Sequence, residues 1–145
     1  MGKKVKVENS LSIILGKASR LLSNQISKNM AEYRVTAEQW AILASLWRHD
    51  GQGQQALADM ANKNKASITH LIDNLEKRKL VTRQADESDR RNKIIFLTEE
   101  GRSLQEELAK IVKKTTKEVT RDIDKKELKS AKKVMKRMIE KLLAD

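Results

Sequence analysis

The stretch from Gln54 to Thr98 constrains the fold most. Its apolar residues are spaced first as in a helix and then as in extended strands. Four apolar residues recur at i, i+3, i+4 and i+7, namely Ile68, Leu71, Ile72 and Leu75. This spacing places an apolar stripe along one side of a helix. A shorter helical pattern, with Leu57 and Ala61 one turn apart, comes before it, and a polar turn separates the two. The sequence therefore predicts a short helix, a turn and a longer amphipathic helix.

The pattern changes after Leu80. Val81 to Gln84 alternates between the two sides of an extended chain, and Lys93 to Leu97 is β-branched and aromatic, so both runs are predicted to be short strands. The segment Asp86 to Asn92 between them has no apolar residue and is rich in turn formers. Two helices followed by a two-stranded hairpin is the layout of a winged helix-turn-helix, so we expect a mainly α fold whose longer helix recognises DNA and whose hairpin is the wing.

Polar side chains occupy the side of the predicted recognition helix opposite the apolar stripe. Short donors and acceptors of this kind can reach base edges in the major groove. We expect base or nearby phosphate contacts from Ser67, Thr69, His70 and Asn74, of which Ser67, His70 and Asn74 share one face by spacing. At the turn, Lys63 and Lys65 are expected to contact phosphates. At the hairpin tip, Arg90 and Arg91 can enter a narrow minor groove or bind phosphate.

Two motifs in this stretch resemble those of the MarR family of bacterial transcription regulators. The first is Lys65-Ala-Ser-Ile-Thr-His-Leu-Ile-Asp-Asn-Leu-Glu-Lys-Arg-Lys-Leu-Val81, and the second is Asp89-Arg90-Arg91 followed by Leu97-Thr98-Glu-Glu-Gly101. The family's wing carries Asp-x-Arg, then Leu-Thr and Gly at the same spacing. The resemblance covers nearly the whole chain. Lys79 departs from it, because the family often has glycine there to end the recognition helix in a left-handed turn.

The resemblance implies several properties. Arg91 matches the family's wing arginine, and Asp89 is expected to hold it in position through a charge-assisted hydrogen bond. Many members also bind small aromatic or phenolic acids in a crevice between the dimer base and the DNA-reading lobes. Core packing is the simpler interpretation of Trp40 and Trp47, but Trp40 opens its helix near the first one and is the better candidate for the edge of such a pocket.

The net charge supports a polyanionic partner. The chain has 145 residues, 31 Lys and Arg against 20 Asp and Glu, and a net charge of +11 with a pI near 9.9. A balance this basic suits nucleic acid or an acidic membrane surface, and the helix-turn-helix pattern favours nucleic acid. The many lysines from Lys110 to Lys141 flank an apolar stripe and are most simply a solvated face. Lys3, Lys4 and Lys6 precede the first helix and are expected to fray, with a basic arm on DNA as the alternative.

Long helices are expected on both sides of the winged unit. The first runs from Ser10 to about Ala31; a capping box at Thr36–Gln39 starts the next, which ends near Gly51. Another helix follows Thr98 toward Asp122, and a last one begins at Asp124 with apolar residues at heptad spacing. We divide the chain into an N-terminal tail and dimerisation helix (1–34), a DNA-binding lobe (35–100) and C-terminal dimerisation helices (101–145), in one intertwined homodimeric domain.

The sequence argues against several other classes. Cysteine is absent, which excludes disulfides, thiolate metal sites and the reactive-cysteine sensing of peroxide-responsive family members. The two histidines, His49 and His70, have no zinc-site spacing, and no glycine-rich phosphate loop or Ser-His-Asp triad can be identified. We therefore expect no metal, no cofactor and no enzymatic activity. No apolar run approaches a membrane span and no signal peptide is recognisable, so we expect a cytoplasmic protein.

These observations predict a homodimeric, sequence-specific transcription regulator, most simply a repressor, that binds a pseudo-palindromic operator on double-stranded DNA. A small aromatic or phenolic effector that releases it is a further expectation from the resemblance. Two alternatives stand beside this one. The lysine content also suits a sequence-nonspecific architectural DNA-binding protein, and the long amphipathic helices suit a helical protein-interaction module.

Overall fold

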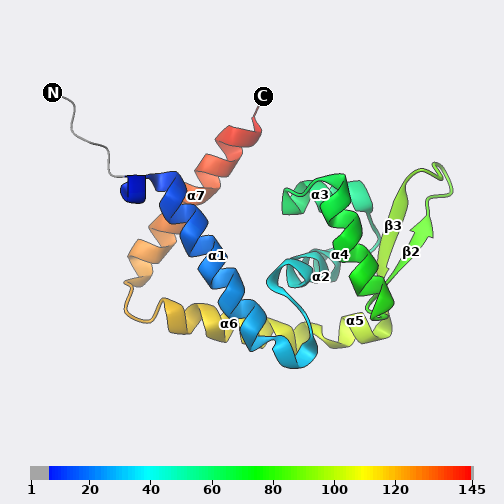
Figure 1. The fold of residues 1–145 in the computed structure, drawn as a ribbon, viewed down its shortest axis with the longest axis horizontal. Helices are drawn as coiled ribbons and strands as arrows, with labels where there is room; N and C mark the ends of the chain where they lie inside the picture. Colours follow the sequence, from blue (N-terminus) through cyan, green and yellow to red (C-terminus); the bar gives the residue numbers. More distant parts are fainter. Residues whose placement is uncertain (1–6, 145) are drawn as a thin grey trace.

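A computed structural model describes residues 7–144 and arranges them as a helical base and a winged lobe, which the segment α5–α6 connects (Figure 1). The sheet is small and antiparallel, and helices make up most of the rest. The expected mainly α winged helix-turn-helix fold is thus confirmed. The tail lysines Lys3, Lys4 and Lys6 lie outside the described residues.

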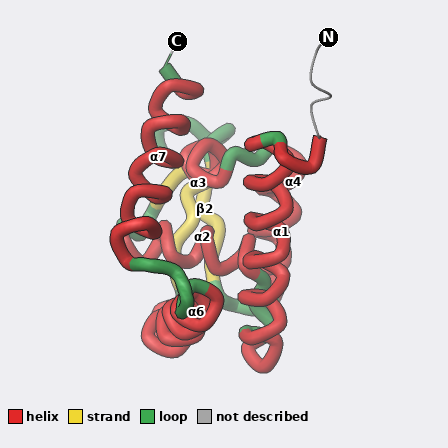
Figure 2. The backbone as a smooth tube through the Cα atoms, turned by 90° about the vertical axis from the view of Figure 1, so that its left-hand side faces the viewer, coloured by secondary structure: helices red, strands yellow, loops and turns green. Residues whose placement is uncertain are grey.

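The base contains α1 (Leu11–Asn29), α6 (Gln105–Val119) and α7 (Lys125–Leu143), with a single turn of 3₁₀ helix, η1 (Val7–Asn9), at its start. Helix α1 packs on α6, where the Asn29 side-chain amide donates to the buried Thr115 hydroxyl (2.8 Å). Helix α7 has no buried residue, and Figure 2 shows α1 and α7 as two separate columns. Both helices therefore leave apolar surface uncovered in the single chain.

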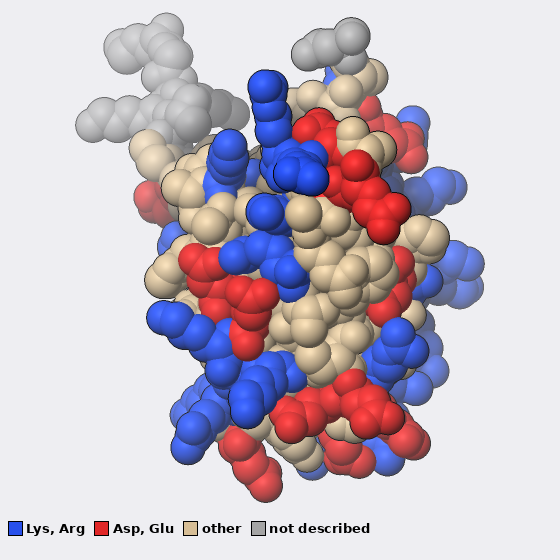
Figure 3. Space-filling view, turned by 90° about the vertical axis from the view of Figure 1, so that its right-hand side faces the viewer, with Lys and Arg blue, Asp and Glu red and all other residues tan. Residues whose placement is uncertain are grey.

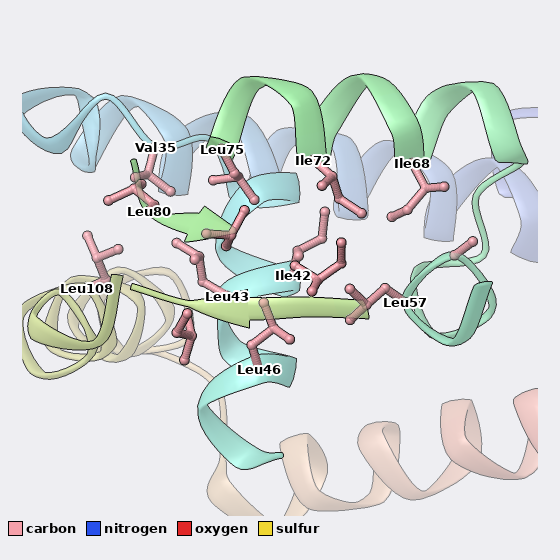
Figure 4. Packing of buried hydrophobic residues seen from close by; sticks show 14 of the residues in the cluster. Val35, Ile42, Leu43, Leu46, Leu57, Ile68, Ile72, Leu75, Leu80 and Leu108 are labelled. Atoms are coloured by element: carbon pink, nitrogen blue, oxygen red, sulfur yellow. The ribbon is translucent and has the colours of Figure 1, made fainter. Parts of the chain in front are cut away.

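Helix α2 (Ala37–Arg48) follows a second 3₁₀ turn, η2 (Ala31–Tyr33), and forms the centre of the core. The expected capping box is present, since the Thr36 hydroxyl accepts from the Gln39 amide (3.2 Å) and the Gln39 side chain accepts from the Thr36 amide (3.0 Å). Buried leucines and isoleucines of α2 face those of the recognition helix in Figure 4. This cluster comprises, among others, Ile42, Leu43, Leu46, Leu57, Ile68, Ile72 and Leu75.

The winged lobe contains α3 (Gln54–Ala61), α4 (Lys65–Lys77), β2 (Val81–Ala85) and β3 (Lys93–Leu97). Strands β2 and β3 pair in register from Val81 opposite Leu97 to Ala85 opposite Lys93, which makes the expected hairpin. A two-residue strand that the sequence did not predict, β1 (Gln52–Gly53), adds to the other edge of β3. Two residues are too few to show an alternating pattern in the sequence.

The helix expected from Thr98 toward Asp122 is divided in two. Helix α5 (Glu99–Ser103) begins at Thr98, whose hydroxyl accepts from the Gly101 amide (3.1 Å), and α6 begins only after Leu104. The Ser103 hydroxyl donates to the Glu100 carbonyl (2.7 Å), the acceptor that the Leu104 amide would use in a continuous helix. Competition of the Ser103 hydroxyl for the Glu100 carbonyl accounts for the break between α5 and α6, which the spacing of the apolar residues does not show.

Recognition helix α4 ends in a left-handed turn at Lys79, a conformation that favours glycine. Lys79 has φ of +60°, its amide donates to the Glu76 carbonyl (2.9 Å), and the Leu80 amide donates to the Leu75 carbonyl (3.0 Å). These two bonds form a Schellman motif, and the buried side chains of Leu75 and Leu80 provide its apolar contact. The helix therefore ends at this turn, with a lysine in a strained backbone conformation.

Gly101 allows α5 to approach the end of α4. A Cβ atom on Gly101 would lie 2.1 Å from the Leu80 carbonyl oxygen, so only glycine fits there. The same Leu80 oxygen accepts from the Thr98 amide (3.1 Å), and the Gly101 carbonyl accepts from the Trp47 indole (2.9 Å). The glycine of the Leu-Thr-x-x-Gly pattern is thus explained by close packing.

We expect Lys79→Gly to stabilise the protein. The left-handed conformation costs a side-chain-bearing residue about 1–2 kcal/mol, and the greater freedom of glycine in the unfolded chain offsets part of that gain. The net increase in the free energy of unfolding should be about 1 kcal/mol, measured by urea denaturation at fixed protein concentration. Lys77→Gly, inside the last turn of α4, is the matched control and should destabilise by a similar amount. A loss of stability in Lys79→Gly would contradict the analysis of this turn.

Candidate nucleic-acid interface

The start of α4 is formed by two asparagines that the sequence analysis did not single out. Asn62 ends α3 with φ of +50°, and the Asn64 side chain accepts from the Ser67 amide (2.8 Å) as the N-cap of α4. Asparagine tolerates the left-handed backbone conformation of Asn62, and it is a preferred N-cap residue, as at Asn64. Because Ile68, Ile72 and Leu75 are buried, this turn leaves the opposite side of α4 exposed.

Three of the predicted contact residues share that exposed side. Ser67 and His70 are exposed, Asn74 is half-buried, and the Asn74 amide nitrogen lies 3.4 Å from His70 Nε2 one turn away. Together they present a hydroxyl, an imidazole and an amide along one face. Each can donate or accept a hydrogen bond, which is the chemistry that base edges in a major groove require.

Thr69 lies elsewhere and is already engaged within the protein. Its hydroxyl donates to the Lys65 carbonyl (2.7 Å) and accepts from the Gln54 side-chain amide (2.8 Å). The threonine thereby holds the Gln54 side chain, at the start of α3, against the start of α4. Gln54 was not among the predicted site residues, and its only signal in the sequence is its place at the first position of α3.

The two predicted lysines of the turn also differ. Lys63 forms an ion pair with Glu38 at the start of α2 (Nζ to Oε2, 2.6 Å). Lys65 is exposed and lines a small cavity of about 190 Å³ between the two helices and the wing. Arg91 and Lys93 line the same cavity from the hairpin, together with Gln54, Gln55, Ile68 and Asn92.

This cavity, the Lys65–Arg91–Lys93 cavity, brings three cations from two elements to one place without a carboxylate among the residues that line it. Such a cluster favours an anion. Sequence analysis identified Lys65 and Arg91 but not Lys93, which appeared there only as the first residue of a strand. Tertiary packing accounts for the miss, because it brings the start of α4, with Lys65, against the hairpin where Arg91 and Lys93 lie two residues apart.

The wing tip is held by hydrogen bonds that two aspartate side chains accept. Asp89 Oδ1 accepts from the backbone amide of Arg91 (3.0 Å), and Asp86 Oδ1 accepts from the Ser88 amide (3.0 Å) and hydroxyl (2.8 Å). The amide bond and the hydroxyl bond from Ser88 lower the pKa of Asp86, so this carboxyl stays ionised further into acid. Asp89 therefore orders the backbone of Arg91. Among the described residues it forms no ion pair with the guanidinium group, which stays exposed.

A half-buried ion pair joins the wing to the recognition helix. The Arg83 side chain on β2 is 19% exposed and reaches Asp73 on α4 (Nη2 to Oδ1, 2.7 Å) and, less closely, Glu76 (Nη1 to Oε1, 3.7 Å). Asp73 and Glu76 are three residues apart on one helix face, a spacing in the sequence that is typical of a paired acidic site for a cation. The pair keeps the hairpin at a set distance from α4.

The two tryptophans have different surroundings. Trp47 donates its indole N–H to Gly101 and packs on the core, as the simpler interpretation expected. Trp40 is half-buried, and its indole nitrogen is buried without a hydrogen-bond partner among residues 7–144. A cavity of about 770 Å³ at the turn between α6 and α7 is lined by other residues and does not include Trp40. The proposed role of Trp40 at a pocket edge remains a prediction.

The Arg83 ion pair generates a prediction about stability. Arg83→Met keeps the apolar stem but removes the charge that Asp73 faces, so the free energy of unfolding should fall by about 1–2 kcal/mol. Arg90→Met at the exposed wing tip is the matched control and should change it by less than about 0.5 kcal/mol. A double-mutant cycle with Asp73→Asn should give a coupling near 1 kcal/mol. Additive effects of the two substitutions would show that the pair contributes nothing.

Comparison with known proteins adds to this geometry. The sequence profile of the MarR family matches residues 35–93, which include α2, the two helices of the helix-turn-helix and most of the hairpin. The organic hydroperoxide resistance transcriptional regulator of Bacillus subtilis is 28% identical over 107 residues, covering 74% of this chain and 73% of that protein. The regulator MhqR of the same species is 30% identical over 91 residues, 63% of either chain.

Solved structures show the same fold. A MarR transcriptional regulator from Methanosarcina mazei Go1 superposes with a TM-score of 0.79 at 29% identity, covering 90% of this chain and 96% of that one. Two less similar structures share the fold alone. These are S. aureus MepR in complex with DNA (TM-score 0.81, 24% identity, 91% and 98% covered) and Rhodococcus jostii CouR bound to p-coumaroyl-CoA (0.80, 20%, 90% and 92%).

Among residues 7–144, no helix has both the length and the apolar character needed to cross a membrane. The winged lobe agrees with the family profile over residues 35–93 and with the superposed structures. On these grounds residues 35–93 form a MarR-family domain, and the chain resembles MarR family transcriptional regulators over most of its length.

Proposed function

We propose that the protein is a homodimeric repressor that binds a pseudo-palindromic operator in cytoplasmic double-stranded DNA. The observation that carries the proposal is the Lys65–Arg91–Lys93 cavity beside the exposed polar side of α4. A phosphate held there would set the register of the duplex, and Ser67, His70 and Asn74 would then read bases in the major groove. Arg90 would reach the backbone or the adjacent minor groove from the wing tip.

Uncovered apolar residues support the homodimer. On α1, Leu11, Ile14 and Leu21 are 51–58% exposed. On α7, Val134, Ile139, Leu142 and Leu143 are 53–76% exposed. Stripes of this kind on two helices of one chain are an interaction surface. A twofold partner that covers them would place two winged lobes side by side, with half-sites about one helical turn apart.

Trp40 supports an effector with a hydrogen-bond acceptor. Its buried indole nitrogen has no partner in the part of the chain that the structure describes, and an unsatisfied buried donor costs about 1–3 kcal/mol. The carboxylate or phenolic oxygen of an aromatic acid could accept that hydrogen bond while its ring packs against the indole. CouR, which shares the fold, has been crystallised with p-coumaroyl-CoA. We therefore propose a small aromatic or phenolic effector that releases the protein from DNA.

The operator is tested by selecting bound sites from a random duplex library at physiological salt and sequencing them. We expect an enriched inverted repeat with half-site centres about 10 base pairs apart. Arg91→Ala should weaken binding to that repeat at least tenfold, because it removes a cation from the Lys65–Arg91–Lys93 cavity. Lys28→Ala on α1 removes the same charge outside the interface and should leave the affinity within twofold. Salt-sensitive binding with no enriched sequence would instead favour the architectural alternative.

The effector proposal is tested by thermal unfolding with a panel of benzoic, salicylic and cinnamic acids. A ligand that binds only the folded protein raises its Tm, and we expect at least one acid to do so for the wild type. Trp40→Phe keeps the ring but removes the N–H donor, and it should reduce that shift. Trp47→Phe is the control and should keep it, although its own Tm is lower. An equal shift in both variants would rule out Trp40 as the ligand's partner.

A further inference from the structure

The net positive charge of this protein does not lie on the winged lobe, which is proposed to bind the operator. Residues 35–100 carry ten Lys and Arg and ten Asp and Glu, so the winged lobe is neutral. Residues 1–34 carry seven basic and two acidic side chains, and residues 101–145 carry fourteen and eight, which together account for the whole net charge of +11. Figure 3, which looks at the end of the molecule with the wing, shows red and blue side chains interspersed.

Helix α7 alone carries more than half of the net positive charge of the chain. Helix α7 carries eight Lys and Arg and two Glu, a net charge of +6 over 19 residues. All eight basic side chains are exposed. Within residues 7–144, no ion pair involves α7. Their charges are thus compensated by no carboxylate of the described chain, although each extra like charge on one helix is unfavourable.

The charges are ordered around the helix axis. At 100° per residue, five basic residues gather within an arc of about 100°, and we name them the lysine face: Lys126, Lys129, Lys133, Lys136 and Arg137. Glu140 is the one carboxylate in this arc. The apolar stripe, which includes Leu128, Met135 and Leu142, is centred on the opposite side of the helix. Covering the stripe with a second protomer therefore leaves the lysine face outside.

We propose that the lysine face of α7 is a second DNA-binding surface, which holds a second duplex through its backbone phosphates, independently of sequence. It extends about 17 Å along the helix from Lys126 to Arg137, about half of one duplex turn. Lysine is a flexible point charge that suits phosphate without specifying bases. The proposal rests on the DNA-binding function proposed above, but it concerns another surface and another duplex.

Duplex DNA fits this surface better than two other polyanions. Single-stranded nucleic acid is usually held by aromatic side chains on which bases stack, and none of the chain's four aromatic residues lies beyond Phe96. An amphipathic helix binds an acidic membrane through its apolar side, which in α7 is the stripe that the partner protomer would cover. A second duplex, rather than the flank of the operator, follows from position, because α7 and the wing lie toward opposite ends of the longest axis in Figure 1.

The first test measures affinity for a 40-base-pair duplex of unrelated sequence by fluorescence anisotropy, as a function of salt. Lys129→Gln, Lys133→Gln and Lys136→Gln are combined in one α7 variant, since glutamine keeps the helix propensity. We expect its affinity to fall at least tenfold and the slope of log affinity against log salt to become shallower by about 2–3. The matched control combines Lys17→Gln, Arg20→Gln and Lys28→Gln on α1, which remove the same charge. An equal loss in both variants would overturn the proposal.

The second test uses the selected operator, immobilised on beads and saturated with protein, and measures capture of the labelled unrelated duplex. The wild type should capture it and the α7 variant should not, although both occupy the operator equally. Failure to occupy the operator would count against the proposed function, whereas occupancy without capture would overturn the second surface. A weaker affinity of the α7 variant for a long operator duplex, again without capture, would mean that the lysine face contacts the flanks. Preferential binding of single-stranded RNA or anionic vesicles through the lysine face would also overturn it.

Discussion

The fold depends on the junction at Leu80, where the recognition helix, the wing and α5 meet. The Leu80 amide closes the left-handed turn of α4, its side chain is buried, and its carbonyl oxygen accepts from Thr98 at the end of the hairpin. Gly101 then passes so close to that oxygen that a Cβ atom has no room. One residue thus sets the exit of the recognition helix, the closure of the wing and the start of the connection to the base. In the sequence, this junction corresponds to the spacing between Leu80, Thr98 and Gly101.

Much of this arrangement could be predicted because it is local. The stripe from Ile68 to Leu75, the capping box at Thr36 and the turn-rich hairpin tip each act within a few residues, and the structure contains all three. The break at Leu104 was missed because a serine hydroxyl competes with the helix without altering its apolar period. Strand β1 was missed because it exists only through pairing with β3.

The site was predictable in its residue types but less so in its partners. Ser67, His70 and Asn74 lie on one exposed side of α4, as helical spacing requires. Whether a basic side chain is exposed or paired is a tertiary property. Glu38 engages Lys63, Asp73 and Glu76 engage Arg83, and only packing brings Arg91 and Lys93 beside Lys65. The net charge of the chain also did not indicate where the basic residues lie. A neutral lobe and a strongly basic helix give the same total as a basic lobe would.

The ion pair of Arg83 has a mechanical consequence. Asp73 lies midway along α4 and Arg83 midway along β2, so the hairpin is braced against the helix at a point away from their common junction at Leu80. Contacts at these two separate points, the Arg83 ion pair and the Leu80 junction, oppose rotation of the hairpin relative to α4. The winged lobe therefore keeps its shape, and in a dimer the quantity that can change is the distance between the two winged lobes.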